Sequence, residues 1–217
     1  MIEVVGMIYR SNVFADFMED QGCVDRVVAN DPQPELDTDG CDIYHDPNPT
    51  DHYLARVYRC WNYCVQSSTA EYVCLVNSDM AFSTGWLEAL ERRLDGKTLP
   101  CSRLVEPGFI KPGQHAIEID LGRDPRRFPM DAWHRMATDL SDARTEAGGL
   151  FMPCVLHRST FLAVGGYPEG NVPSADGQVV SGDALLFKKM QDAGFQHVTC
   201  FDSLVYHMQE GEMRHIE

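Results

Sequence analysis

The hydrophobic residues of this 217-residue chain form short β-forming runs that alternate with amphipathic segments. Runs typical of strands cover residues 4–9, 24–29, 41–44, 72–76, 102–105, 150–156 and 198–206. Segments with helical spacing cover residues 14–20, 51–65, 86–94, 131–144, 159–164 and 183–192. Strands and helices that alternate in this way are typical of an α/β sheet with helices on its faces.

Two stretches interrupt this alternation. Residues 108–130 contain three prolines, three glycines and a cluster of arginines, which favours a long functional loop over core. Residues 168–181 form a polar loop rich in Gly, Pro, Asp and Ser, and such a loop could close over a ligand as a lid.

Composition and charge exclude several classes of protein. Apolar residues make up 44% of the chain and charged residues 24%, as in ordinary globular domains. The formal net charge of −15 argues against a general nucleic-acid binder, whose phosphate contacts require an excess of Lys and Arg. No segment approaches the roughly 20 apolar residues of a membrane span, so we predict no membrane span and a cytosolic protein. The eight cysteines lack CxxC spacing, which favours buried free thiols.

The most informative local feature is the polar triplet Asn77, Ser78 and Asp79, which follows the apolar run 72–76. Ligands of open α/β sheets bind at the carboxyl ends of the strands, where this triplet is expected to lie. Asn and Asp are also common turn residues, so the triplet alone leaves an ordinary turn open.

Three later motifs add to the triplet in a fixed order. They are RSTFLAVGGYPE at 158–169, SGDALLFKKMQDAG at 181–194 and DSLVYH at 202–207. This succession resembles the family 2 type of GT-A glycosyltransferases and extends over nearly the whole chain. The resemblance implies one GT-A domain over 1–217, a mixed α/β sheet flanked by helices. Its nucleotide-binding half would span about 1–106 and its acceptor-side half about 107–217.

The resemblance also assigns the metal and catalytic residues. Asp79 matches the last acid of the DxD-like motif, which binds Mn²⁺ or Mg²⁺ against the diphosphate, and Asn77 stands where the family often has another Asp. His207 matches a late histidine that completes the metal shell in several GT-A enzymes, and an imidazole ligand favours Mn²⁺; a surface histidine is a nearly equal alternative. Asp183 matches the general base that gives inversion, with Gly182 where the family usually has a second acid.

Nucleotide contacts are implied at the ends of the first two strands and on the helix at 51–65. The residues are Tyr9, Ser11, Asp31 and Asn62, together with Asn77 and, more weakly, Asn30; Arg56 and Arg59 lie on the same helix as Asn62. UDP is the default nucleotide because it is the most frequent in the family. Capping and packing explain the helix segment equally well.

The acceptor side is less well defined. Arg123, Arg126 and Arg127, with Lys111, could meet the diphosphate or an anionic acceptor, although a solvated loop is an equal alternative. Further acceptor-side candidates are Trp133, His134, Gly165, Gly166 and Tyr167, of which Trp133 could instead belong to the core.

The predicted activity is therefore metal-dependent transfer of a sugar from a nucleotide-diphosphate sugar to an acceptor hydroxyl, with inversion. A nucleotidyltransferase remains an alternative, but the chain lacks a glycine-rich, lysine-containing phosphate loop near its start. A degenerate, non-catalytic binding module is a further alternative, favoured by Asn77 and Gly182 in place of acids. The motifs GxxxxGK[ST] and GxGxxG are absent, which excludes a P-loop kinase and a dinucleotide enzyme.

Overall fold

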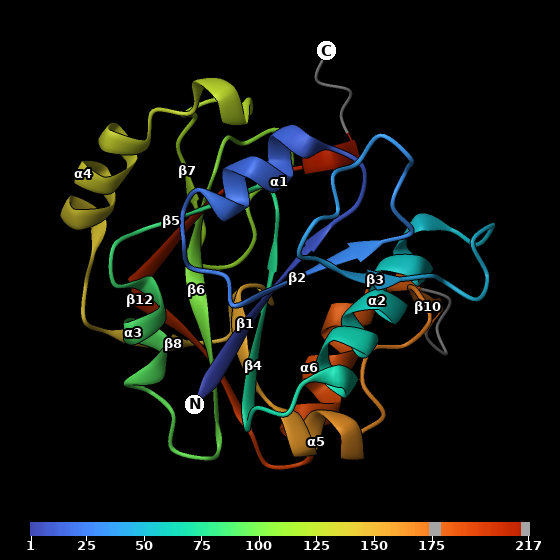
Figure 1. Ribbon diagram of the computed structural model, residues 1–217. Helices are drawn as coiled ribbons and strands as arrows, with labels where there is room; N and C mark the ends of the chain where they lie inside the picture. Colours follow the sequence, from blue (N-terminus) through green and yellow to red (C-terminus); the bar gives the residue numbers. More distant parts are fainter. Residues whose placement is uncertain (174–178, 214–217) are drawn as a thin grey trace.

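The computed structural model describes residues 1–173 and 179–213, and Figure 1 traces the chain. The main sheet has the strand order β3-β2-β1-β4-β9-β6-β12-β5, with β7 beside β6 and β8 beside β12. Its strands are β1 (Ile2–Ile8), β2 (Arg26–Asn30), β3 (Asp42–Tyr44), β4 (Tyr72–Asn77), β5 (Met80–Phe82), β6 (Thr98–Glu106), β7 (Ile117–Glu118), β8 (Thr145–Ala147), β9 (Cys154–His157) and β12 (Gln196–His207). A separate antiparallel pair consists of β10 (Val172–Pro173) and β11 (Val179–Val180).

The directions of the strands bring several carboxyl ends together. β1, β2, β3 and β4 are mutually parallel, whereas β9 is antiparallel to both β4 and β6. β12 is parallel to β6 and antiparallel to β5. Because two reversals restore the direction, β1 to β4, β6 and β12 all end at the same edge of the sheet. We call it the carboxyl edge.

Helices lie on both sides of this mixed sheet, which confirms the predicted fold class. In Figure 1, α2, α5 and α6 gather on one side, α3 and α4 lie on the other, and α1 crosses in front of the sheet. The helices are α1 (Asn12–Glu19), α2 (Tyr53–Ser67), α3 (Trp86–Glu91), α4 (Met130–Leu140), α5 (Arg158–Ala163) and α6 (Gly182–Asp192), with the 3-10 turns η1 (Pro125–Arg127) and η2 (Gly211–Met213).

The structure corrects the predicted path after Asp79. The sequence pattern predicts a turn that leads directly into a helix, but β5 lies between Asp79 and α3. All three residues of β5 are buried, and β5 pairs with the end of β12 at the margin of the sheet. Of the predicted lid at 168–181, residues 174–178 lie outside the part of the chain that the structure describes.

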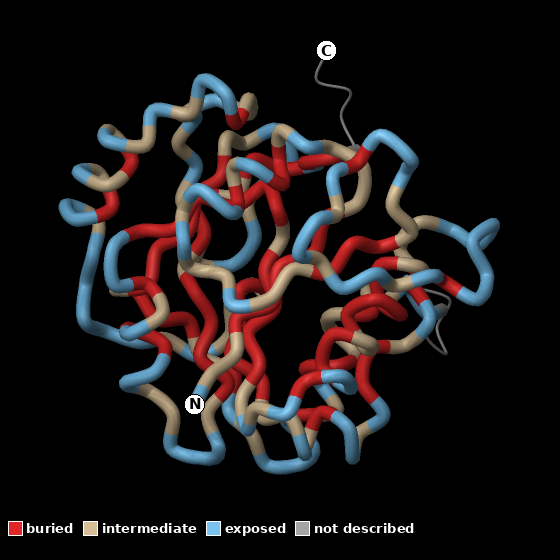
Figure 2. Tube along the Cα trace, viewed as in Figure 1, coloured by how far each residue is buried: buried red, intermediate tan, exposed pale blue. Residues whose placement is uncertain are grey.

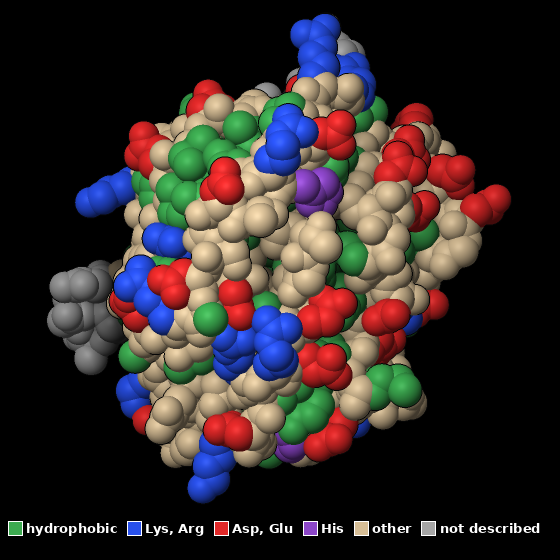
Figure 3. Space-filling view, turned by 90° about the vertical axis from the view of Figure 1, so that its left-hand side faces the viewer, with side chains coloured by type: hydrophobic (Ala, Val, Ile, Leu, Met, Phe, Trp, Pro, Cys, Tyr) green, Lys and Arg blue, Asp and Glu red, His purple; other side chains and the backbone are tan. Residues whose placement is uncertain are grey.

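The core follows the strands, which form the buried centre of the molecule in Figure 2. All eight cysteines are free; Cys23 and Cys41 are partly exposed and the others are buried. On the face drawn in Figure 3, acidic and basic side chains are interspersed.

Helix α2 is anchored to the loop after β3 by a buried ion pair. The Arg59 guanidinium donates to both carboxylate oxygens of Asp46, at 2.8 Å each for its closest contacts. The side chains are 9% and 0% exposed, respectively. Burial acts to raise the pKa of Asp46, but the hydrogen bonds from Arg59 and from the Asn48 N–H, together with the charges of Arg59 and Arg56, outweigh it and hold the pKa below its usual range. The outer side of Arg59 also contacts Asp51, at 3.1 Å, which is 46% exposed.

We expect Asp46→Asn to lower the free energy of unfolding by about 3 kcal/mol, because Arg59 would lose its buried counter-charge and keep only the more exposed Asp51 and Glu169. A carboxyl pKa that is lowered by folding stabilises above its unfolded value and ceases to do so as the pH falls through the folded value. The wild type and the variant should therefore converge below about pH 4. Urea denaturation across pH measures this difference. Asp51→Asn is the matched control, with an expected loss under about 1 kcal/mol, and equal losses in both variants would contradict the role of burial.

Candidate active site

Two adjoining cavities lie at the carboxyl edge of the sheet. The first, of about 200 Å³, is lined by Met7, Tyr9, Tyr53, Leu54, Val57, Trp61, Asn77, Ser78, Asp79, His207, Glu210, Gly211 and Glu212. The second, of about 210 Å³, is lined by Trp61, Asn77, Met80, Leu104, Glu106, Leu150, Phe151, Met152, Asp183 and His207. Trp61, Asn77 and His207 line both, so the cavities share a wall. A larger cavity of about 810 Å³ between α1, the start of α3 and α4 shares no lining residue with them.

Three strand ends place Asp79, His207 and Glu106 in contact. His207 Nε2 lies 3.3 Å from Asp79 Oδ2, and His207 Nδ1 lies 2.9 Å from Glu106 Oε1. Burial acts to lower the pKa of His207, but the charges and hydrogen bonds of Asp79 and Glu106 outweigh it and raise the pKa to about 10. The imidazolium is therefore held between two carboxylates. Glu106 was not among the predicted site residues, although it directly follows the apolar run 102–105.

Asp79 and His207 could hold a metal ion whose other ligands come from a substrate, once the ion displaces the proton from His207 Nε2. Two ligands about 2.1 Å from one ion and at right angles lie roughly 3 Å apart, close to the separation of these two side chains. Within residues 1–173 and 179–213, no group of three His, Cys, Asp or Glu side chains is arranged to hold a metal by itself. An oxygen and an imidazole nitrogen favour Mn²⁺ over Mg²⁺.

Asp183 enters the second cavity from the first turn of α6. Ser181 caps this helix by accepting the N–H of Ala184, and the Tyr58 hydroxyl donates to Asp183 Oδ2 at 3.0 Å. Burial raises the pKa of Asp183, although the hydrogen bond from Tyr58 opposes it. Asp183 lines the same cavity as His207, one of the two predicted metal residues, and as Asn77, a predicted nucleotide contact.

Gly182 has no room for a side chain. A Cβ at this position would lie 2.4 Å from Cε2 of Tyr58. Gly182 stands where GT-A enzymes of family 2 usually have a second acid. The ring of Tyr58 gives a physical reason for glycine at this position. Tyr58 occupies the space and binds Asp183 with its hydroxyl.

The end of β1 and the end of β2 are joined by charged side chains. Asp31 Oδ2 accepts from Arg56 Nη2 at 2.7 Å, and Arg56 Nη1 donates to the Tyr9 hydroxyl at 3.2 Å. The Arg56 guanidinium also lies 5.5 Å from the centroid of the Tyr9 ring. Asp31 adopts a left-handed backbone with φ 43°. Asn30 is buried, and its Oδ1 finds no hydrogen-bond partner among the described residues.

The backbone at the start of α1 binds a carboxylate. Glu212 accepts the N–H groups of Tyr9, Arg10 and Ser11 at 3.1, 2.6 and 2.8 Å, and the Ser78 hydroxyl at 2.6 Å. Burial raises the pKa of Glu212 against these bonds. No motif in the sequence indicates this contact, since more than 200 positions separate its partners.

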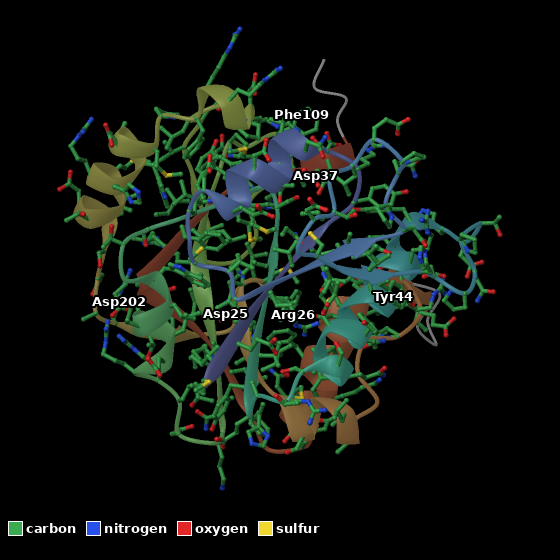
Figure 4. All side chains as sticks on the ribbon, in the orientation of Figure 1. Asp25, Arg26, Asp37, Tyr44, Phe109 and Asp202 are labelled. Carbon is green, nitrogen blue, oxygen red and sulfur yellow. The ribbon has the colours of Figure 1, made fainter. Side chains whose placement is uncertain are left out.

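Arg123 holds the turn that delivers Glu212. Its guanidinium donates to the carbonyl oxygens of Met208 and Gln209 and contacts Glu210, and it lies 4.0 Å from the centroid of the Phe109 ring. Figure 4 labels Phe109 near this turn, at the top of the view. The predicted diphosphate role of Arg123 stays a prediction.

Asn62 supports the glycine turn on the acceptor side. Its amide donates to the carbonyl oxygen of Tyr167 at 2.9 Å and accepts the Tyr167 N–H at 2.8 Å. Gly166 has φ 62°, and a Cβ there would lie 2.4 Å from Asn62 Oδ1. These contacts account for Asn62, Gly166 and Tyr167 as structural residues, and their predicted ligand contacts stay predictions.

The structure separates the remaining acceptor candidates from the two cavities. Trp133 is fully buried beside Tyr206, with ring centroids 5.9 Å apart, so the prediction of an acceptor platform is wrong and Trp133 is a core residue. Arg126 and Arg127 are exposed on η1, where Arg126 pairs with Asp124 at 3.0 Å. Neither arginine belongs to the lining of either cavity at the carboxyl edge.

Comparisons with known proteins support the fold of this chain but no family. Searches with the sequence match no family model and no curated protein. Among solved structures, the fold is similar to "Crystal structure of GalNAc-T7 with UDP, GalNAc and Mn2+", with a TM-score of 0.56 and 10% sequence identity. The match covers 95% of this chain and 43% of that one, so this chain spans less than half of its neighbour. The fold is thus GT-A-like, and membership of family 2 stays a prediction.

Nothing in the described part of the chain is a helix with the length and apolar character that crossing a bilayer requires.

We expect Gly182→Ala to destabilise the protein by about 1–3 kcal/mol, because its methyl group would overlap Tyr58. Helix propensity alone predicts the opposite sign, a gain of up to about 1 kcal/mol. Thermal or urea unfolding measures the difference. When Gly182→Ala is made in Tyr58→Ala protein, it should cost much less stability than in the wild type, because the ring that it would overlap is gone. An equal cost in both backgrounds would contradict the packing argument.

Proposed function

We propose that this protein is a metal-dependent glycosyltransferase that moves a sugar from a nucleotide-diphosphate sugar, UDP-linked by default, to an acceptor hydroxyl with inversion. The single observation that carries the proposal is that Asp79, His207 and Asp183 line two cavities with a common wall at the carboxyl edge of a GT-A-like sheet. A structural neighbour described with UDP, GalNAc and Mn²⁺ supports it at the level of the fold.

The first cavity is the proposed place of the nucleotide diphosphate. Tyr9 belongs to its lining and is bonded through Arg56 to Asp31, which makes these residues candidates for the nucleoside contacts. Asp79 and His207 would hold the cation between this cavity and the second one. A bound Mn²⁺ supplies charge neutralisation for the departing diphosphate.

The second cavity is the proposed place of the reacting acceptor. Asp183 takes the proton of the acceptor hydroxyl while that oxygen forms a bond to the anomeric carbon. The bond from the anomeric carbon to the diphosphate oxygen breaks, and the nucleoside diphosphate leaves with the electron pair. The Tyr58 hydroxyl fixes Asp183 Oδ2, which leaves Asp183 Oδ1 to receive the proton.

A non-catalytic binding module is the second candidate, and one observation favours it. The Glu212 carboxylate lines the first cavity and already accepts the backbone N–H groups there. The cavity, at about 200 Å³, is also smaller than the roughly 300–1,000 Å³ typical of ligand pockets. For the transferase, the ligand must extend into the second cavity or the turn at 208–212 must move.

We expect one nucleoside diphosphate with Mn²⁺ to raise the melting temperature by about 5–10 °C at a hundredfold excess over its dissociation constant, because a ligand of the native state alone adds about 2.7 kcal/mol there. A thermal-shift panel of UDP, GDP, CDP and dTDP with Mn²⁺, Mg²⁺ or EDTA measures it. Asp79→Asn should abolish the dependence on Mn²⁺, whereas Asp142→Asn at an exposed acid should not. No shift with any pair at millimolar ligand would contradict the transferase.

We expect Asp183→Asn to lower kcat by about 10²- to 10⁴-fold with little change in melting temperature, because the amide cannot accept the proton. Burial raises the pKa of Asp183, so the wild-type rate should fall with decreasing pH at a midpoint above the ordinary aspartate value. Asp192→Asn, at an exposed acid of the same helix, is the control. Transfer that is indifferent to Asp183→Asn would remove the base assignment, and nucleotide binding without any transfer would favour the binding module.

A further inference from the structure

Trp61 presents a fixed aromatic wall to both cavities at the carboxyl edge. Its ring centroid lies 5.5 Å from that of Tyr58 and 5.2 Å from that of Tyr167, and the residue is 7% exposed. Tyr58 and Tyr167 are themselves stacked, with centroids 5.2 Å apart and planes within 5°. This packing leaves the indole little freedom to turn.

The indole N–H of Trp61 donates no hydrogen bond within the described part of the protein. Nε1 is buried and finds no hydrogen-bond partner among residues 1–173 and 179–213. An unsatisfied buried donor costs on the order of 1–3 kcal/mol, so it requires an explanation. Trp133 also has a buried Nε1 without a partner in the described chain, but Trp133 lines neither of the two cavities.

The position of Trp61 restricts which part of a ligand can reach it. Trp61 shares the wall between the cavities with Asn77 and His207. On one side lies the metal candidate Asp79, and on the other the base candidate Asp183. In a transfer reaction, the sugar lies between the departing diphosphate and the attacking hydroxyl.

We propose that Trp61 is a sugar-binding residue whose indole N–H donates a hydrogen bond to a hydroxyl or ring-substituent oxygen of the transferred sugar. The inference rests on the proposed function and specifies its donor subsite. A neutral donor on a rigid aromatic plane suits a sugar, because the ring can cover the C–H face while the N–H binds one oxygen. A phosphate oxygen is the less favoured ligand, since Asp79 and His207 already define the place of the metal-bound diphosphate.

The test compares ligands that differ only in the sugar. UDP and UDP-glucose, UDP-galactose, UDP-N-acetylglucosamine and UDP-N-acetylgalactosamine are titrated with Mn²⁺ into wild type, Trp61→Phe and Trp133→Phe. Phenylalanine keeps an aromatic ring and removes the N–H. We expect Trp61→Phe to leave the affinity for UDP within about twofold and to weaken the best UDP-sugar about 3- to 10-fold. Trp133→Phe should leave the ratio of the two affinities unchanged.

A spectroscopic measurement separates a direct contact from a change of shape. The chain has three tryptophans, and ¹⁵N-labelled wild type resolves their indole N–H signals. The Trp61 signal should shift when the UDP-sugar replaces UDP, while the signals of Trp86 and Trp133 stay in place.

Two outcomes would overturn the inference while the proposed function stands. One is an equal loss of affinity for UDP and the UDP-sugar in Trp61→Phe, and the other is no loss together with an unmoved Trp61 signal. Wild-type protein that binds no nucleoside diphosphate with any metal would instead overturn the proposed function and the inference with it. The thermal-shift panel of four nucleoside diphosphates with Mn²⁺ or Mg²⁺ on the wild type identifies this last case before any variant is compared.

Discussion

The register between β5 and the end of β12 determines the geometry of the whole site. His207 pairs with Met80 and Val205 with Phe82, and the Met208 N–H donates to the carbonyl oxygen of Asp79 at 3.0 Å. Successive side chains of a strand point to opposite faces, so a slip by one residue would turn His207 away from Asp79. Tyr206 opposes such a slip, because it is fully buried and its hydroxyl donates to the Gly122 carbonyl at 2.8 Å. The core around Tyr206 thus stabilises the contact between Asp79 and His207 from the other face of the sheet.

Two pairs of residues in the site fit one another closely, and one of these pairs explains why Gly182 departs from the family pattern. The ring of Tyr58 leaves room only for glycine at 182, and the hydroxyl of the same ring donates to the neighbouring Asp183. Asn62 requires glycine at 166 and holds the backbone of Tyr167, whose ring stacks on Tyr58. Because each pair is a steric and a hydrogen-bonding match, one member cannot change without the other. The aromatic cluster and the Asp183 side chain are therefore one structural unit.

The sequence predicts the elements of this fold better than it predicts the contacts between them. Strands and helices follow from local periodicity, and the polar ends of β4 and β12 led to Asp79 and His207. β5 was missed because three apolar residues form a strand only when β12 lies beside them. Glu212 could not be predicted, because its partners at the start of α1 are distant in sequence and are backbone N–H groups, which every residue offers. The sequence left Trp133 open between the acceptor side and the core, because an aromatic residue beside an arginine-rich loop gives the same local pattern in either place.

Electrostatics gives an independent reason to expect a cation at the carboxyl edge. The chain carries a formal net charge of −15, and the two cavities are lined by the carboxyl groups of Asp79, Glu106, Asp183, Glu210 and Glu212. His207 supplies one positive charge between two of these groups, which leaves the site without excess positive charge for an anionic ligand. A diphosphate that entered such a partly buried site alone would meet like charge at low dielectric, where repulsion is strong. A divalent cation would remove this repulsion for the ligand and the carboxylates together, so the charge of the site is consistent with the proposed donor being bound together with a metal ion.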